Sequence, residues 1–137
     1  MSAPRGDARC CFVCGPDNPI GLKLNFVVDG VRCHGEFTSA SGHAGFDGVT
    51  HGGIVFSVLD DAMANWFFLQ GARGFTAKAE IRYRAPMPIG ATANIECMVV
   101  KRKGRLLQLE ARAQDKTSHV VFAESSASFM LEDGGPL

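Results

Sequence analysis

The chain has 137 residues and no net formal charge at neutral pH, and 46% of its residues are hydrophobic. This length predicts one domain, residues 1–137, large enough to bury a core, with a disordered tail at residues 1–9. The balanced charge excludes the basic surface field on which non-specific nucleic-acid binding depends. No apolar run is long enough to span a bilayer, and the first residues lack the apolar stretch of a secretory signal. We therefore expect a cytoplasmic protein with neither nucleic-acid nor membrane partners.

The five cysteines do not form the pattern of a disulfide framework. An odd number in a chain without a signal peptide argues against structural disulfides. The Cys11-x-x-Cys14 spacing is compatible with the start of a zinc site that Cys33 and His34 would complete, but a structural zinc site usually closes with a second tightly spaced pair. We therefore expect no metal, and we expect Cys33 and Cys97 to be small apolar strand residues. The sequence assigns no role to the three N-terminal cysteines.

Alternating apolar and polar residues mark the strands. Residues 22–28 and 31–37 alternate in this way, and the Asp29-Gly30 pair between them is a strong signal for a two-residue hairpin turn. In the second half of the chain the period of two returns, with a turn at residues 86–90 and a hairpin at Lys103-Gly104. The later strands are expected at residues 76–84, 95–99, 107–113 and 121–129.

One long apolar helix is predicted from Gly52 to Leu69, ending ahead of Gly71. Its apolar residues form one broad arc, and few residues on the other side suit free solvent. Two strands, this helix and four more strands in meander order predict an α+β fold, in which an antiparallel sheet of about six strands wraps around one central helix. Such a sheet leaves an edge strand and apolar area exposed, so we expect a homodimer.

The start of this helix carries the residues that point to chemistry. His51-Gly52-Gly53 places bare backbone N–H groups at a helix N-terminus, where the helix dipole favours negative charge. Nine residues after His51, Asp60 stands among Val, Leu, Ala and Met, where a carboxylate is unfavourable unless it has a partner or a task. A helix end that polarises a carbonyl, together with an isolated carboxylate, favours hydrolysis of an activated acyl group.

Three stretches of the chain resemble the hotdog-fold acyl-coenzyme A thioesterases, in their PaaI-like branch. They are Cys11 to Leu22 (CFVCGPDNPIGL), His51-Gly52-Gly53 followed by Asp60, and Ile81 to Pro86 (IRYRAP) with its Pro-Ile-Gly turn. The resemblance implies hydrolysis of acyl-coenzyme A to a carboxylic acid and free coenzyme A, without a metal or an organic cofactor. It also implies a homodimer, often paired into a tetramer, with each active site at the dimer interface.

In that arrangement the His-Gly-Gly turn of one subunit faces the aspartate of the other. The spacing gives independent support, since nine residues at about 100° each place His51 and Asp60 half a turn apart on the helix. One helix therefore does not aim both groups at one atom, and a site shared across a two-fold axis removes the conflict.

The resemblance also suggests the catalytic roles. Asp60 is the general base or the nucleophile, acting on the thioester carbonyl carbon through a water molecule or directly. The Gly52 N–H polarises the thioester oxygen, and His51 orients the turn or the substrate carbonyl. Thr76 stands where relatives carry a hydroxyl that helps to hold the attacking water. The alternatives are structural: a hydrogen-bonded acid at the interface, glycines that permit a tight turn, a packed histidine, and a threonine with ordinary strand propensity.

A second group of residues is expected to bind the substrate. Gly53 and Phe46 are placed beside the acyl group, and Asp61 is the alternative to Asp60 because one sequence does not exclude a shift of one residue. The basic residues around the Lys103-Gly104 turn are expected to hold the coenzyme A phosphates, unless they form an ordinary solvated hairpin. These basic residues are Arg102, Lys103 and Arg105.

One departure from the family pattern keeps other functions open. Relatives often have Asn or Gln a few residues ahead of His-Gly-Gly, whereas residues 43–48 read HAGFDG here, and Ala44 and Gly45 lack such a side chain. The alternative functions are a non-catalytic module that binds acyl-coenzyme A and a hotdog dehydratase or hydratase. The sequence does not determine the acyl group.

Overall fold

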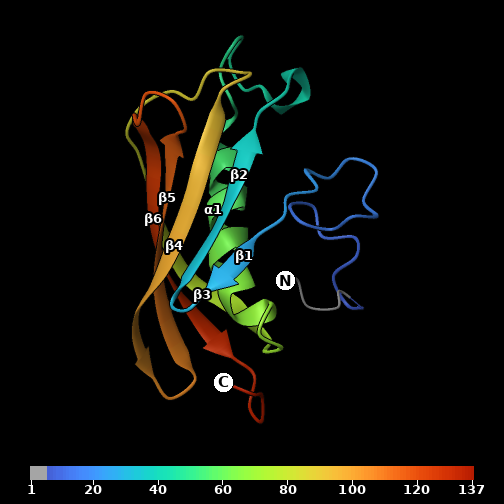
Figure 1. The fold of residues 1–137 in the computed structure, drawn as a ribbon, viewed down its shortest axis with the longest axis vertical. Helices are drawn as coiled ribbons and strands as arrows, with labels where there is room; N and C mark the ends of the chain where they lie inside the picture. The colour runs from blue at the N-terminus through green and yellow to red at the C-terminus, as the bar shows by residue number, and fades with distance from the viewer. Residues whose placement is uncertain (1–5) are drawn as a thin grey trace.

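The computed structural model describes residues 6–137, and its one long helix lies against a strongly curved antiparallel sheet (Figure 1). The α-helix, α1, spans Gly52–Phe68 and ends one residue before the predicted Leu69. A short 3-10 turn, Ser41–His43, precedes it. The strands are β1 (Val27–Asp29), β2 (Arg32–Thr38), β3 (Gly74–Tyr83), β4 (Thr92–Lys103), β5 (Leu106–Asp115) and β6 (Val121–Leu131).

The order of the strands confirms the predicted fold class but corrects the predicted connectivity. The sheet runs β1-β2-β4-β5-β6-β3, and all neighbours are antiparallel. The prediction that the last four strands form a meander is wrong for β3, which pairs with β6 and not with β4. The reason is that α1 crosses the sheet between β2 and β3 and delivers the chain to the far edge. Residues 84–91 then return to the middle, where β4 pairs with β2.

The first predicted strand is also shorter than its alternation indicates. Only Val27–Asp29 pairs with β2, rather than residues 22–28. The N–H groups of Leu22 and Leu24 donate instead to the carbonyls of Phe12 and Val13, at 2.8 and 2.9 Å. The alternation therefore predicted correctly which of these side chains are buried. However, the backbone of residues 22–24 hydrogen-bonds to the N-terminal segment and not to the sheet. The hairpin turns predicted at Asp29-Gly30 and Lys103-Gly104 are both present.

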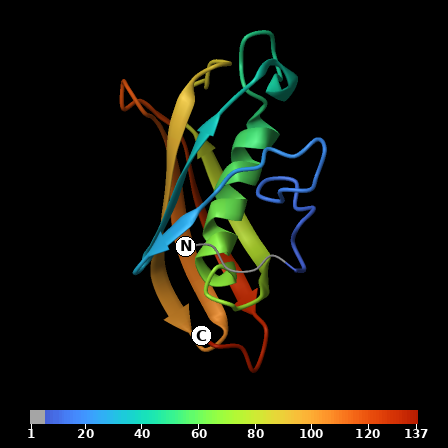
Figure 2. The same cartoon turned by 45° about the vertical axis from the view of Figure 1, so that its right-hand side comes forward.

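The core lies between α1 and the concave face of the sheet, as the two ribbon views show (Figure 2). The helix contributes the arc predicted from its sequence, in which Leu59 and Met63 are fully buried. Sheet residues such as Ile95 and Phe129 are buried in the same core, and Phe129 packs edge-on against Phe67 with ring centroids 5.5 Å apart. Cys33 and Cys97 are buried on adjacent strands, which confirms their prediction as small apolar strand residues.

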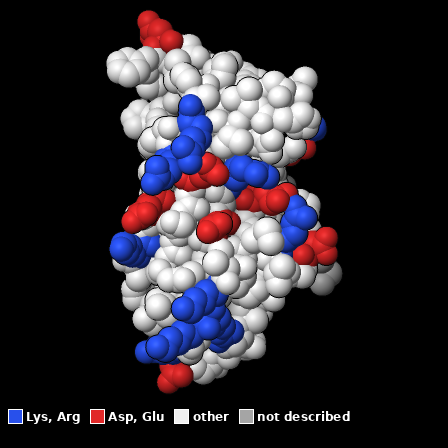
Figure 3. All heavy atoms as spheres, turned by 90° about the vertical axis from the view of Figure 1, so that its left-hand side faces the viewer, with Lys and Arg blue, Asp and Glu red and all other residues white. Residues whose placement is uncertain are grey.

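The convex face of the sheet differs sharply from this core. Figure 3 shows acidic and basic side chains mixed across it. The period of two along each strand explains the contrast, because alternate residues of one strand point to opposite faces. Side chains that line a shallow depression on this charged face include Glu80, Arg82, Glu96, Glu110, Arg112 and Glu124.

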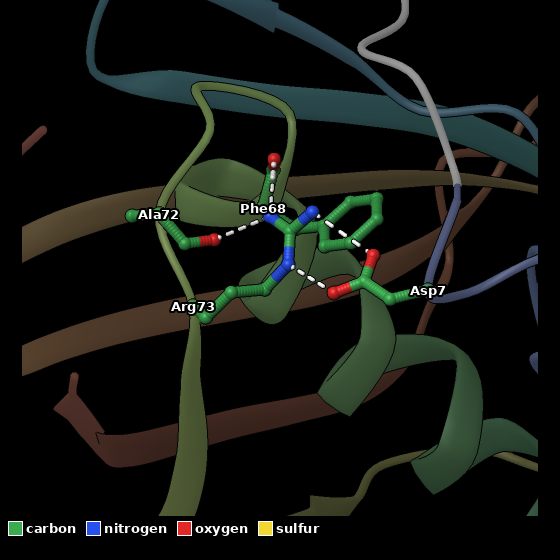
Figure 4. A network of polar contacts seen from close by, with 4 residues as sticks. All are labelled: Asp7, Phe68, Ala72 and Arg73. Atoms are coloured by element: carbon green, nitrogen blue, oxygen red, sulfur yellow. Dashed lines mark hydrogen bonds and ion pairs between the residues drawn. The ribbon is translucent and has the colours of Figure 1, made fainter. Parts of the chain in front are cut away.

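The N-terminal segment, residues 6–26, lies on the side of α1 that faces away from the sheet (Figures 1 and 2). Asp7 accepts from Arg73 at 2.6 Å, and the Arg73 guanidinium stacks 4.0 Å above the Phe68 ring (Figure 4). Arg9 and Asp17 form a second ion pair within this segment, at 2.6 Å. Of the tail predicted at residues 1–9, the first five residues lie outside the described part of the chain. Within the described part, no helix combines the length and the apolar character needed to cross a membrane.

Candidate active site

The His-Gly-Gly turn forms the N-terminus of α1, with His51 as its N-cap. The His51 Nδ1 accepts a hydrogen bond from the Gly53 N–H at 2.8 Å, which satisfies one of the donors that a helix start leaves unpaired. A Cβ on Gly53 would lie 3.0 Å from the His51 ring, so a glycine permits this close cap. The Gly53 N–H, predicted to bind substrate, is therefore engaged within the turn.

Gly52 is the first helical residue, so its N–H has no carbonyl one turn earlier within the helix. The helix dipole makes this position favourable for a developing negative charge. The Tyr83 hydroxyl donates to the Gly52 carbonyl at 2.8 Å, and a Cβ on Gly52 would lie 3.2 Å from the Tyr83 ring. Gly52 thus allows the end of β3 to approach the helix start. The sequence alone does not mark Tyr83 as a site residue, because a strand tyrosine gives no signal by itself.

A cavity of about 690 Å³ opens beside this helix start. Its lining is mainly apolar and includes Val55, Met87 and Phe122, while Phe46, 87% exposed, also contributes to its wall. Thr50 in the lining is buried, and its Oγ1 has no hydrogen-bond partner among residues 6–137. The cavity therefore offers a mainly apolar space that borders the first N–H of the helix, a combination typical of a small-molecule site.

Asp60 lies half-buried in the middle of α1 and is held by Thr76, whose Oγ1 donates to Asp60 Oδ1 at 2.8 Å. Burial raises the pKa of Asp60, the hydrogen bond from Thr76 opposes that rise, and negative charge on Cys11 adds to it. A carboxylate with a raised pKa is a better proton acceptor than an exposed one. The structure thus brings together two residues that are predicted from the sequence to be catalytic.

Thr76 faces Asp60 because β3 contains an irregularity. The pairing of β3 with β6 shifts between Thr76 and Lys78, so Thr76 pairs with the buried Phe129 and Ala79 pairs with Ala127. Directly paired residues point to the same face, so Thr76 shares the helix-facing side with Phe129. Simple alternation would have placed Thr76 with Lys78 on the outer face. A bulge that turns one side chain toward a site is a recurrent device in sheets.

The structure does not bring Asp60 and Gly52 of one chain together. They are eight residues apart on one helix, which is about 12 Å along its axis. Asp60 points to β3 at Thr76, whereas the Gly52 end of the helix borders the cavity. One chain therefore supplies both the carboxylate and the helix N–H donor, but at two separate places.

The other predicted substrate residues do not line the cavity beside Gly52. Asp61 faces the N-terminal segment, where its Oδ1 accepts from the Cys11 thiol at 3.4 Å and its Oδ2 accepts from Asn65 at 2.8 Å. The three basic residues of the β4–β5 hairpin are exposed and lie at the end of the molecule opposite the start of α1 (Figure 1). Within one chain neither Asp61 nor Arg102, Lys103 or Arg105 adjoins the cavity lining.

Comparisons with known proteins agree with this architecture. A family model described as the thioesterase superfamily matches residues 47–122, which include the helix start, Asp60 and Thr76. Acyl-coenzyme A thioesterase THEM5 of Mus musculus is 28% identical over 86 residues, which are 63% of this chain and 35% of that protein. The chain thus spans about a third of the length of this curated relative.

Solved structures share the fold at low sequence identity. The PaaI protein from the phenylacetic acid degradation operon of E. coli has a TM-score of 0.76 at 17% identity, covering 83% of each chain. The smu.793 protein of Streptococcus mutans UA159, whose structure is bound to acetyl CoA, has a TM-score of 0.73 at 14% identity, covering 80% of this chain and 88% of that one. At such identities the likeness establishes the hotdog fold.

The cap geometry predicts how His51 contributes to stability. His51→Ala removes the acceptor for the Gly53 N–H and is expected to lower the free energy of unfolding by about 1 kcal/mol. His51→Asn, which offers a side-chain acceptor suited to an N-cap, is expected to retain most of that stability. Urea unfolding of the three proteins at equal concentration measures this. Equal loss in both variants would show that the imidazole contributes something other than the cap.

Proposed function

The chain belongs to the thioesterase superfamily, and from that membership we propose that it hydrolyses an acyl-coenzyme A thioester to a carboxylic acid and free coenzyme A. The observation that carries the proposal is the half-buried Asp60 held by Thr76, on the same helix whose first N–H belongs to Gly52. A curated relative is named an acyl-coenzyme A thioesterase, and a protein of the same fold is bound to acetyl CoA, which supports coenzyme A as the thiol half of the substrate.

In the proposed reaction the Gly52 N–H donates to the thioester carbonyl oxygen and stabilises the negative charge that develops there. Asp60 of the partner subunit removes a proton from a water molecule, whose oxygen attacks the carbonyl carbon; direct attack by the carboxylate is the alternative. The tetrahedral intermediate then expels coenzyme A as a thiolate. A thiol has a pKa near 8.5, so this leaving group needs no strong acid. The residues proposed to act at the reacting atoms require no metal and no organic cofactor.

The separation of Asp60 from Gly52 supports a homodimer. β3 has a strand neighbour on its β6 side only, among the described residues, so it forms an edge of the sheet. Phe75 and Tyr83 on this strand are 63% and 55% exposed in the single chain. An exposed edge strand with large apolar side chains is a favourable surface for a second copy. Pairing along β3 about a two-fold axis would set the two α1 helices side by side and join the two half-sites.

The finer features of the substrate and assembly remain proposals. The apolar cavity beside Gly52 receives the acyl group, and Phe46 covers its opening. The basic β4–β5 hairpin is proposed to hold the coenzyme A phosphates, which requires the hairpin of another subunit because it is remote from Gly52 of its own. A pairing of dimers into a tetramer and a cytoplasmic location stay predictions of the sequence.

Replacement of the carboxylate tests the proposed base. Asp60→Asn keeps the shape of the side chain but removes its basicity, and we expect kcat to fall by about 10²- to 10⁴-fold. The measurement is thiol release from a panel of acyl-coenzyme A thioesters of different chain length and aromatic character. Asp29→Asn is the matched control, since Asp29 is exposed in a hairpin turn where Asn-Gly serves as well as Asp-Gly.

Equal rates for the wild type and Asp60→Asn would remove Asp60 from the mechanism. Tight binding of acyl-coenzyme A without turnover by the wild type would favour the non-catalytic module instead. Hydration of enoyl-coenzyme A without thiol release would favour the hydratase alternative.

The Gly52 N–H is tested by a pair of substitutions at one position. Gly52→Pro removes the donor while suiting the first helical position, and the His51 backbone (φ −59°, ψ 132°) already has the conformation that precedes proline. Gly52→Ala adds a Cβ near the exposed Tyr83 but keeps the N–H. We expect kcat to fall about 10²- to 10³-fold for Gly52→Pro and far less for Gly52→Ala. Similar losses in both would indicate crowding rather than loss of a donor.

A further inference from the structure

Two cysteines of the N-terminal segment and one carboxylate of α1 form a compact cluster that the proposed reaction does not use. One ligand atom from each of Cys11, Cys14 and Asp61 lies within 4.8 Å of the other two. Cys14 is buried, and the other two side chains are half-buried. The two cysteines are close in the sequence, whereas Asp61 is brought beside them only by the fold.

The distance between the Cys11 sulfur and the Asp61 carboxylate matches the first coordination sphere of zinc. With Zn–S near 2.3 Å and Zn–O near 2.0 Å, two ligands at a tetrahedral angle are about 3.5 Å apart. The Cys11 Sγ lies 3.4 Å from Asp61 Oδ1. Two thiols and a carboxylate are also a donor set that zinc accepts, whereas magnesium and calcium prefer oxygen ligands alone. The cluster therefore has both the distance and the chemistry for this ion.

The turn that carries the two cysteines is tightly wound around Cys11. The Gly15 N–H donates to the Cys11 carbonyl at 2.9 Å, and a Cβ on Gly15 would collide with backbone atoms of Arg9 and Cys11. This close return of the chain at Gly15 keeps Cys11 and Cys14 on one tight turn.

Asn65 supports the cluster from behind. It is 2% exposed, and its Nδ2 lies 2.8 Å from Asp61 Oδ2 and 3.7 Å from the Cys14 sulfur. One amide thus donates toward both a carboxylate and a sulfur of the cluster. Side chains that orient metal ligands in this manner are a regular feature of metal sites. The same Nδ2 also donates to the Asp61 backbone carbonyl at 2.8 Å, which fixes the asparagine one helical turn after the carboxylate that it orients.

We propose that Cys11, Cys14 and Asp61 bind one zinc ion, with water as the fourth ligand, and that this ion fastens the N-terminal segment to α1. Both cysteines bind as thiolates, so their protons pass to solvent when the metal binds. The site differs from the one outlined by the cysteine spacing alone, since Cys33 is buried beside Cys97 within the sheet and His34 is exposed on β2. The helix supplies Asp61 in place of that second pair.

The role of the ion is structural and does not depend on the proposed thioesterase activity. Cys14 and Val13 belong to the buried core, so the N-terminal segment covers apolar surface of α1. An ion that binds the folded chain and not the unfolded one stabilises the folded form by mass action. Loss of the ion is therefore expected to lower stability and to loosen the N-terminal segment.

The test measures metal content of the full-length chain and of four variants. After dialysis, the wild type is expected to retain about one zinc per chain by elemental analysis. Cys11→Ser, Cys14→Ser and Asp61→Asn are expected to bind zinc at least tenfold more weakly. Cys10→Ser is the matched control, because Cys10 is exposed in the same segment but outside the cluster, and it is expected to bind like the wild type.

Two further measurements on the wild type avoid reliance on variants that fold poorly. Cobalt(II) added to the metal-free chain is expected to give a thiolate-to-cobalt charge-transfer band, and zinc is expected to raise the melting temperature by several degrees. No cobalt band, no change in melting temperature with zinc, or equal zinc content in the wild type and Cys14→Ser would overturn the proposal. So would a Cys11–Cys14 disulfide in protein purified without an oxidant.

Discussion

The hydrogen bond between Thr76 and Asp60 is the interaction on which the rest of this account depends. It fixes a half-buried carboxylate on the side of α1 that faces the edge strand β3, and it does so at a point about 12 Å along the helix from the Gly52 N–H. A rigid helix does not shorten that distance. If these two groups act on one carbonyl, as we propose, they come from two copies of the chain, so the proposed chemistry requires assembly.

The fold positions each half-site by a different local device. At the helix start, two glycines admit the His51 cap and the close approach of Tyr83 from the end of β3. In the middle of the helix, a bulge in β3 turns Thr76 toward Asp60. Both devices use the same edge strand, which is also the strand with large exposed apolar side chains. Both parts of the site, which belong to α1, thus adjoin the same edge strand whose apolar side chains are exposed.

Much of the fold could be predicted from the sequence because local signals dominate it. The helix from Gly52, the two Gly-containing hairpins and the burial of Cys33 and Cys97 follow from periodicity and turn chemistry. The pairing of β3 with β6 could not, since strand order depends on where the helix delivers the chain and not on any residue within β3. Residues 22–26 were wrongly predicted as part of a sheet strand for a related reason. Alternation indicates a half-buried extended chain, but it does not indicate which segment that chain pairs with.

The site was predicted in part. The helix periodicity predicts that Asp60 and Asp61 point in directions about 100° apart. In the structure Asp60 accepts a hydrogen bond from Thr76 of β3, whereas Asp61 accepts one from Cys11 of the N-terminal segment. Alternation alone would have turned Thr76 outward, and only the bulge, which leaves no reliable mark in the sequence, reverses it. Tyr83 and Asn65 were missed because their importance comes from contacts across long sequence separations.

Subunit mixing tests the shared site most directly. Asp60→Asn and Gly52→Pro chains, each inactive alone on this account, are unfolded together and refolded in equal amounts. Half of the dimers then contain one chain of each kind, and one of their two sites is intact, so about a quarter of the wild-type activity returns. If both groups acted within one chain, no mixed dimer would contain an intact site. Activity that stays at the level of the separate variants, in a mixture shown to contain mixed dimers, would contradict the account.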